Sequence, residues 1–106
     1  MSSTARPFYT TGSWQPLPGQ EKAFIGAWGE FAGWAAELEG SGEAILVHDL
    51  RVEGRYVSFV PWDSMEAIRS WKGHPEFKER MSRVQQFVDK FTPTEAEVVA
   101  RVSGVA

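Results

Sequence analysis

The spacing of hydrophobic residues changes along the chain, and each change predicts a different element. Residues 8–15 and 55–62 are short runs rich in aromatic and β-branched residues, which predicts strands. Residues 43–52 predict a further strand, and only a short Glu-Gly turn separates it from residues 55–62, so the two form a hairpin. Residues 94–102, which follow a proline, predict the fourth strand.

A helix is predicted between the first two strands. From residue 20 to residue 38 the apolar positions recur at helical spacing and give an amphipathic helix with a wide aromatic face. Gly26, Gly29 and Gly33 weaken this helix locally. We interpret them as points where another backbone packs closely.

The hairpin leads directly into a second helix. Asp63 is predicted to cap it, with Glu66 three residues later completing a capping box, and Trp62 packs back on it as a hydrophobic staple. A Lys-Gly pair breaks the helix, and His74 and Pro75 restart it, with Pro75 suited to the first helical position. One face of this second part carries Phe77, Met81, Val84, Val88 and Phe91.

The resulting order is β-α-β-β-α-β, which predicts an α+β fold of the ferredoxin-like, split βαβ type with an antiparallel sheet. A length of 106 residues fits one domain. We expect residues 1–7 to be a flexible N-terminal tail and residues 8–106 to be the single domain.

The strands of the hairpin carry apolar residues on both faces. Leu46 and Leu50 lie on one face, whereas Ile45 and Val47 lie on the other. A sheet with one covered face alternates more cleanly than this. We therefore expect the helices to cover one face and a second copy of the chain, in a homodimer, to cover the other.

Charge and composition exclude several classes of function. The net charge is −3 and the pI is about 5.3, without the basic stripe that nucleic-acid binding requires. The chain has no Cys and two His, which excludes disulfides and leaves too few ligands for a multi-His metal site. No apolar run approaches bilayer length and no hydrophobic signal core is present, so we expect a cytoplasmic protein without membrane association.

The aromatic residues are the main candidates for ligand binding. Five Trp and seven Phe are many for a chain this short, and large aromatic side chains line pockets as well as cores. Trp28, Phe31, Trp62 and Trp71 are the best candidates for the wall of a pocket that takes a small hydrophobic or aromatic ligand. The alternative for each is core packing.

Two polar candidates lie outside this aromatic set. His48, beside Asp49, is a candidate base or hydrogen-bond donor that points into the pocket, and the alternative is a buried, hydrogen-bonded His. His74 fits a helix start better than catalysis. Tyr9 and Tyr56 either bind a phenol or quinone oxygen or belong to the core.

The strongest motif is RYVSFVPWDSMEAIRSWKGHPEF, at residues 55–77. Its informative residues are Trp62, Ser64, Glu66, Ala67, His74, Pro75 and Phe77. This pattern, W-x-S-x-E-A followed by H-P-x-F, resembles the antibiotic biosynthesis monooxygenase (ABM) family, and the element order extends the resemblance over about residues 8–102. The resemblance implies a homodimer in which two sheets form an α+β barrel.

The resemblance also implies a cofactor-independent monooxygenase that acts on a small aromatic or quinol-like substrate. In anthrone-oxidising members, the activated carbanion of the substrate meets oxygen without a metal or cofactor. The positions that these members fill with Asn, Tyr and Arg are here Ser58, Ile68 and, approximately, Met81. Ser58 can still donate a hydrogen bond to a substrate oxygen. Arg80 or Arg83 replaces the Arg only if the helix register differs.

These patterns together predict a pocket between the helices and the sheet. The candidate catalytic residues are His48 and Ser58. The residues expected to bind the substrate are Trp28, Phe31, Tyr56, Trp62, Ile68, Trp71 and Met81.

Two other functions stay open. The chain is alternatively a non-catalytic, ligand-binding or stress-related dimeric α+β barrel, because the Asn, Tyr and Arg positions are not kept. Haem degradation has less support: Trp71 matches the Trp of haem-degrading members, but Met81 stands where their iron-binding His is expected, and the chain has no Asn.

Overall fold

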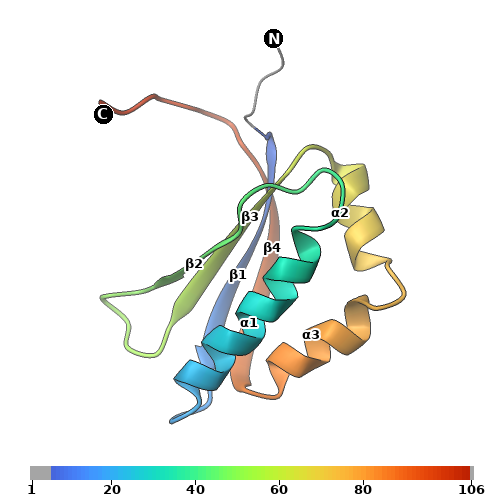
Figure 1. Cartoon of the computed structure of the whole chain (residues 1–106). Helices are drawn as coiled ribbons and strands as arrows, with labels where there is room; N and C mark the ends of the chain where they lie inside the picture. The colour runs from blue at the N-terminus through green and yellow to red at the C-terminus, as the bar shows by residue number, and fades with distance from the viewer. Residues whose placement is uncertain (1–5, 106) are drawn as a thin grey trace.

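The computed structural model describes residues 6–105. The elements in this range are β1 (Phe8–Pro16), α1 (Glu21–Ala35), β2 (Ile45–His48), β3 (Tyr56–Trp62), α2 (Met65–Lys72), α3 (Phe77–Gln85) and β4 (Val88–Glu97). The strands form one antiparallel sheet in the order β2-β3-β1-β4, and the helices pack against one face of it (Figure 1). The predicted ferredoxin-like α+β fold is confirmed, with the second helix divided into α2 and α3.

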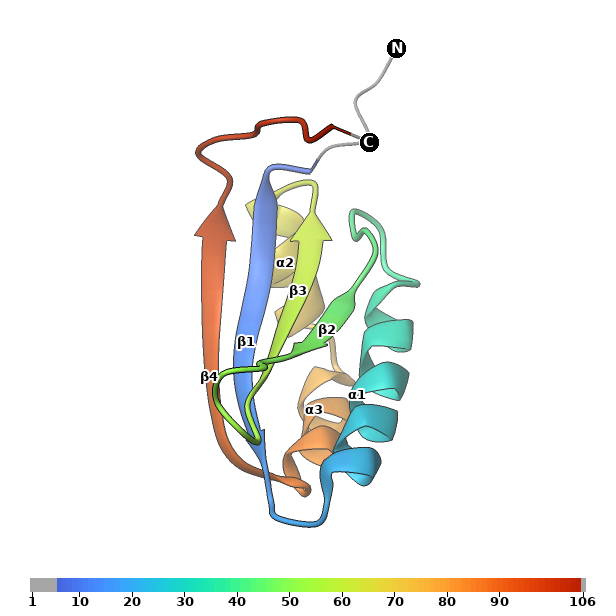
Figure 2. The same ribbon diagram turned by 90° about the vertical axis from the view of Figure 1, so that its left-hand side faces the viewer.

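The central strands β1 and β3 send alternate residues to the two faces of the sheet. On the face covered by the helices, Trp14 is paired with Tyr56, and Gly12 with Ser58. All four residues are buried, and so is Trp62, which lies on the same face of β3. Figure 2 shows the sheet from its other side, with the helices behind and beside it.

Helix α1 buries the aromatic face that its spacing predicts. Phe24 and Phe31 lie in the core, where Phe24 has no exposed surface. The glycines at positions 26, 29 and 33 do not mark a close backbone contact, because a Cβ atom at any of them would meet no described atom within 4 Å. That interpretation was wrong, and these glycines only lower the intrinsic stability of the helix.

Helix α2 is capped by Ser64 rather than by Asp63. Ser64 has an extended backbone, and its Oγ accepts a hydrogen bond from the Ala67 N–H at 3.1 Å, which is the geometry of an N-cap. Asp63 instead forms an ion pair with Arg6, with 2.9 Å between Oδ1 and Nε. The capping box predicted from Asp63 to Glu66 is therefore wrong.

A turn at His74 separates α2 from α3. The Nδ1 atom of His74 accepts a hydrogen bond from the Glu76 N–H at 3.1 Å, and α3 begins at Phe77. Pro75 thus precedes the first turn of α3 and does not occupy its first position. The role of His74 at a helix start agrees with the prediction.

Strand β4 (Val88–Glu97) begins earlier than predicted and ends earlier than residue 102. Val88 and Phe91, which were assigned to the second helix, both lie in this strand. Pro93 also lies within it, opposite Gly12 of β1. A proline is tolerated here because β4 is an edge strand, where the missing N–H can face away from the neighbouring strand.

The connection from β2 to β3 is longer than predicted, because β2 ends at His48. Asp49 holds this turn: its Oδ1 accepts hydrogen bonds from the N–H groups of Arg51 and Val52, and its Oδ2 lies 2.6 Å from Nη1 of Arg55. The pKa of Asp49 is lowered below its ordinary value by these contacts. The hydrogen bond from the Arg51 N–H has the largest effect, followed by the Arg55 side chain and the Val52 N–H.

The face of the sheet turned away from the helices, called here the open face, carries apolar side chains. Ile45 and Val47 of β2 are 46% and 41% exposed, and Phe59 of β3 is 36% exposed. Phe59 is paired with Ile45 and Val57 with Val47, so these side chains form one patch. No helix within residues 6–105 covers it (Figure 2). The prediction of apolar residues on both faces of the hairpin is confirmed within β2 and β3, but Leu50 lies beyond the end of β2 and is 92% exposed.

Both ends of the described chain lie beside the same end of the sheet (Figure 1). Of the predicted tail, residues 1–5 lie outside the described residues, whereas Pro7 accepts a backbone hydrogen bond from Val98 at 2.7 Å. In the described part of the chain, no helix is both long and apolar enough to span a bilayer.

Candidate functional site

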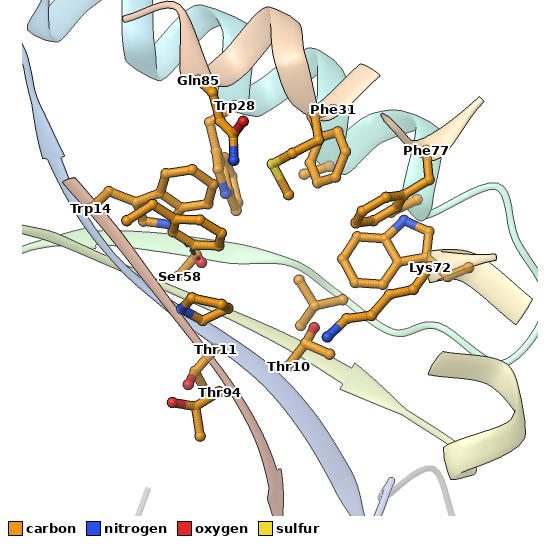
Figure 3. A pocket seen from close by; sticks show the side chains of 17 residues that line it. Thr10, Thr11, Trp14, Trp28, Phe31, Ser58, Lys72, Phe77, Gln85 and Thr94 are labelled. Atoms are coloured by element: carbon orange, nitrogen blue, oxygen red, sulfur yellow. Dashed lines mark hydrogen bonds between the residues drawn. The ribbon is translucent and has the colours of Figure 1, made fainter. Parts of the chain in front are cut away.

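A cavity of about 240 Å³ lies between the covered face of the sheet and the three helices (Figure 3). Six of its 17 lining residues are aromatic. The aromatic residues that line it are Trp14, Trp28, Phe31, Trp71, Phe77 and Phe91. Pockets for drug-sized ligands begin at roughly 300 Å³, so this cavity suits a small ring system.

The aromatic side chains hold one another in place. Trp14 of β1 stacks on Phe91 of β4 with ring centroids 3.9 Å apart. Trp71 of α2 meets Phe31 of α1 at 5.6 Å and meets Phe77 of α3 edge to face at 5.0 Å. Such pairs contribute about 0.5–1.5 kcal/mol each beyond the area they bury. These ring contacts therefore link β1 to β4 and α2 to both α1 and α3 without a ligand.

Gly12 makes room for this arrangement on the sheet. A Cβ atom at position 12 would lie 2.7 Å from Cε1 of Phe91, 2.8 Å from Nε1 of Trp14 and 3.0 Å from Oγ of Ser58. The Trp14 and Phe91 rings can thus cross the sheet above Gly12 only because that residue has no side chain. The floor of the cavity depends on this glycine.

Two buried hydroxyl groups supply much of the polarity of the cavity. Ser58 Oγ accepts a hydrogen bond from Trp14 Nε1 at 2.9 Å, and Thr10 Oγ1 accepts one from Trp62 Nε1 at 3.0 Å. Ser58 is 5% exposed and Thr10 is 7% exposed, and both line the cavity. An indole N–H can only donate, so each hydroxyl keeps its own O–H as a donor. Neither O–H finds an acceptor within residues 6–105.

The indole N–H of Trp71 is a further donor in the wall. It is buried and has no hydrogen-bond acceptor among the described residues. Leaving a buried donor unpaired costs about 1–3 kcal/mol. Buried groups of this kind are rare and call for an explanation such as a ligand.

Lys72 is the charged residue in the lining, and the other lining residues of the described chain are apolar or neutral. Its Nζ lies 2.7 Å from Oε2 of Glu95, so the side chain runs from α2 to β4. Gln85 lies at the opposite end of the cavity from Lys72 (Figure 3). Thr11 and Thr94 lie at the edge with their side chains turned away from the aromatic group (Figure 3).

The structure brings part of the predicted site together. The predicted residues that line the cavity are Trp28, Phe31, Ser58, Trp71 and Met81. They come from α1, β3, α2 and α3, so the cavity lies between the helices and the sheet as expected.

Three predicted residues lie in the core instead of the wall. Trp62 and Ile68 have no exposed surface, and Tyr56 is buried against Phe24 with ring centroids 5.5 Å apart. Trp62 supports the wall from behind, because its ring packs 5.1 Å from that of Trp71 and its N–H fixes the Thr10 hydroxyl. Trp62 therefore supports the cavity wall without lining it, and Ile68 and Tyr56 do not reach the cavity.

His48 lies outside the cavity as well. It is exposed on β2, and its ring stacks on Tyr56 with centroids 4.6 Å apart. Neither expected location, inside the pocket or buried in the core, is correct. The reason is that β2 is the edge strand beyond β3, at the side of the sheet away from the cavity.

The two arginines of α3 do not reach the cavity. Arg80 pairs with Glu76 at 2.9 Å and lies over the Trp34 ring, and Arg83 pairs with Glu79 at 2.7 Å. The register of α3 places Met81 in the wall and both arginines on other faces. Neither arginine takes the position that the resemblance reserved for one.

Sequence reasoning missed other lining residues. Thr10 and Trp14 share strand parity with Gly12, and this alternation was a usable signal for the covered face of β1. Phe91 could not be found in the same way, because it was assigned to a helix. Lys72 was read only as part of a helix break.

A second, more open depression lies beside the start of α2. Its lining includes Glu39, Asp63, Glu66 and His74. Within residues 6–105, no group of three or more His, Cys, Asp or Glu side chains is arranged to hold a metal ion.

The chain is similar to known proteins in sequence pattern and in fold. The sequence model described as "Antibiotic biosynthesis monooxygenase" (ABM) matches residues 7–83. No curated protein matches the sequence.

Several solved structures share the fold. A variant of SnoaB, a cofactor-independent oxygenase from Streptomyces nogalater, is 13% identical with a TM-score of 0.83, over 94% of this chain and 100% of that one. Rv0793 from Mycobacterium tuberculosis is 16% identical with a TM-score of 0.77, over 92% and 99%. PA3566 from Pseudomonas aeruginosa is 14% identical with a TM-score of 0.73, over 93% and 100%.

Proposed function

Because this chain belongs to the antibiotic biosynthesis monooxygenase family, we propose that it oxidises a small aromatic, quinol-like substrate with molecular oxygen, without a metal or cofactor. The substrate occupies the aromatic cavity. The fold that the chain shares with SnoaB, a cofactor-independent oxygenase, supports this assignment of reaction class.

The observation that carries the proposal is the chemical character of the cavity. Its aromatic wall fits a flat ring system, and its buried hydroxyls at Ser58 and Thr10 have O–H groups free to donate. Donors without partners fit a ligand that brings acceptors, such as the carbonyl or phenolate oxygens of a quinol-like ring. Ser58 is the residue that we assign to the substrate oxygen, because Trp14 fixes its orientation.

The proposed reaction uses the reactivity of the substrate itself. An acidic C–H or O–H group loses its proton to water, and the resulting anion is delocalised onto the oxygen that Ser58 contacts. The carbanion centre transfers electrons to O₂ and a C–O bond forms. The resulting peroxide anion takes a proton back from water, and the hydroperoxide then loses water, using the hydrogen that remains on the same carbon, to leave a carbonyl group. One O₂ is thereby reduced to the new carbonyl oxygen and one water. Hydrogen bonds to the anionic oxygen stabilise its charge in this water-poor site.

Ser58 acts in this scheme by binding, not as a base. An uncharged hydroxyl does not take the proton of an acid at neutral pH, and the described lining contains no carboxylate or imidazole. His48, exposed and outside the cavity, has no part in the proposed reaction.

A second function, non-catalytic binding of the same class of ligand, rests on a specific observation. Ile68 is fully buried and Met81 is apolar, so the two positions that the resemblance groups with Ser58 add no further polar group to the cavity. Haem degradation is not proposed, because His48 and His74 both lie outside the cavity.

Oxygen consumption with a panel of anthrones and hydroquinones tests the proposal. We expect turnover by the wild type and a loss of about 10-fold or more in Ser58→Ala, since one hydrogen bond to a developing charge is removed. His48→Ala is the matched control and should keep wild-type turnover. If compounds of the panel bind but no oxygen is consumed, the non-catalytic binding function is favoured over the enzyme. If turnover falls equally in Ser58→Ala and His48→Ala, Ser58 has no specific role in binding the substrate.

We further propose that the open face of the sheet packs against a second copy of the chain. The exposed apolar side chains of Ile45, Val47 and Phe59 form a patch on this face, and such patches mark interaction surfaces. Light scattering after size exclusion should give about twice the monomer mass of 11.9 kDa. A monomer at micromolar concentration would contradict this assembly.

A further inference from the structure

Lys72 holds the positive charge nearest to a ligand in the cavity. It is the charged residue among the described lining residues. Its amino end lies on the side of Thr10, whose buried O–H has no acceptor in the described chain (Figure 3). An oxygen on the ligand near Thr10 would therefore meet a hydroxyl donor and an ammonium group at the same end of the cavity.

The present partner of Lys72 can be exchanged at little cost. Its Nζ pairs with Oε2 of Glu95 at 2.7 Å, and the two side chains are 37% and 41% exposed. Exposed ion pairs of this kind contribute about 0–1 kcal/mol. A ligand oxyanion at the rim of a less polar cavity competes well with such a pair, since charge-assisted hydrogen bonds are stronger there than in bulk water.

A positively charged ligand has no comparable partner in the cavity. The described lining contains no carboxylate, and the buried polar hydrogens in it without an acceptor belong to Ser58, Thr10 and Trp71. A cationic ligand would meet the ammonium group of Lys72 and several hydrogen-bond donors, whereas an anionic ligand would meet the same groups as favourable partners once it displaces Glu95 from Lys72.

We propose that Lys72 is the specificity residue of the cavity, and that it selects aromatic ligands with an anionic oxygen by exchanging Glu95 for that oxygen. This rests on the proposed function, because it requires that the cavity binds an aromatic ligand. It adds the class of ligand: a phenolate, enolate or carboxylate on a small ring system is preferred over its neutral counterpart.

Two probes of nearly equal shape separate charge from ring binding. They are 2-naphthoate, which is anionic at neutral pH, and 2-naphthamide, which is neutral. Titration calorimetry at low ionic strength should show that the wild type binds 2-naphthoate more tightly. In Lys72→Met, which keeps an apolar stem, 2-naphthoate should bind about 10-fold more weakly while 2-naphthamide is unchanged within about twofold.

Two further variants complete the test. Lys78→Met removes the same charge from an exposed position of α3 outside the lining, so it should bind both probes as the wild type does. Glu95→Gln removes the competing carboxylate and should bind 2-naphthoate about threefold more tightly. Added salt should reduce the differences among the variants for 2-naphthoate only.

The outcomes distinguish this inference from the proposed function. If the wild type binds both probes and Lys72→Met changes neither affinity, or weakens both equally, the role of Lys72 is overturned while the aromatic cavity stands. If the wild type binds neither probe, the ligand-binding cavity and the inference fail together. An unchanged 2-naphthoate affinity in Glu95→Gln would overturn Glu95 as the competitor.

Discussion

The two faces of the sheet are built from the same strands but have different surroundings. On β3, Ser58 and Val60 are buried under the helices, whereas Phe59 between them is 36% exposed on the open face. The covered face is closed by helices and yet encloses a cavity. The open face carries an apolar patch on β2 and β3 and yet has no cover within residues 6–105.

This difference separates two functions that a small domain has to combine. The covered face needs a fixed wall that leaves space for a ligand, and interlocked rings such as Trp14 and Phe91 provide it. The open face needs only a flat apolar surface for association. A chain of 106 residues gains stability from such association, because it buries a smaller fraction of its surface than a larger domain does.

The largest expected effect comes from adding a charge to each face in turn. Val60→Asp places a carboxylate on the covered face, where Val60 is 8% exposed, and should lower the free energy of unfolding by at least about 3 kcal/mol. Phe59→Asp, one residue away, should leave the unfolding free energy of a single chain within about 1 kcal/mol. Urea denaturation at low protein concentration measures both.

Protein concentration then distinguishes the roles of the two faces. The unfolding midpoint of the wild type should rise with concentration if the folded chain associates, and the midpoint of Phe59→Asp should not. Similar losses of stability in both variants would mean that the open face belongs to the core of the single chain. The comparison between the faces would then be wrong.

A smaller effect is expected from adding one methyl group to the floor of the cavity. Gly12→Ala forces Cβ against Phe91, Trp14 and Ser58, and overpacking of this kind costs about 1–3 kcal/mol. Gly26→Ala is the matched control, because nothing lies within 4 Å of its Cβ and the helix should gain about 0.5–1 kcal/mol. Thermal unfolding of the two variants should therefore shift in opposite directions.

Ligand binding tests the effect of Gly12→Ala independently of its stability. If the stacked rings move away from the new methyl group, the hydrogen bond from Trp14 to Ser58 is strained, and binding of 2-naphthamide should weaken. A stable Gly12→Ala protein with unchanged binding would show that the wall is softer than its ring contacts suggest.

The fold was predictable because its signals are local. Strand alternation, helical spacing and a Ser or Asp before a helix each depend on a few neighbouring residues, and together they gave the correct α+β class. The errors also have local causes. Proline is a strong stop signal, yet Pro93 lies inside β4 because that strand is at an edge. Asp63 and Ser64 are both good caps, and tertiary contacts decide between them.

The candidate site was only partly predictable because it depends on contacts between distant residues. Trp28, Phe31, Trp71 and Met81 lie on helix faces that periodicity can assign, and these residues do line the cavity. Periodicity cannot distinguish a residue at the cavity surface from a residue that is buried behind that surface. For this reason Trp62 and Ile68 were wrongly assigned to the cavity wall. It also cannot show that Lys72 reaches β4, since that contact joins residues 23 positions apart.

The smallest expected effect concerns the turn that ends β2 beside the open face. The pKa of Asp49 is lowered by the Arg51 N–H and then by Arg55 and the Val52 N–H, so the ionised form is favoured in the folded chain. A lowered folded pKa means that this contribution to stability is present above the pKa of the unfolded chain and is lost as the pH falls through the folded pKa. The protection factors of the β2 amides, which compare the measured exchange rate with the intrinsic rate at the same pH, should therefore fall on acidification.

Asp49→Asn should remove most of this acid dependence, because an amide keeps a hydrogen-bond acceptor but has no charge to lose. Asp89→Asn, on the exposed side of β4, removes a charge far from the turn and should leave the acid dependence of β2 intact. An NMR titration of the Asp49 carboxyl carbon locates the transition directly. If the protection factors of β2 follow that titration while those of β1 and β3 do not, the turn stabilises only the edge of the open face. An equal loss of protection in all strands would instead mean that this edge unfolds together with the covered face, and that the two faces form one cooperative unit.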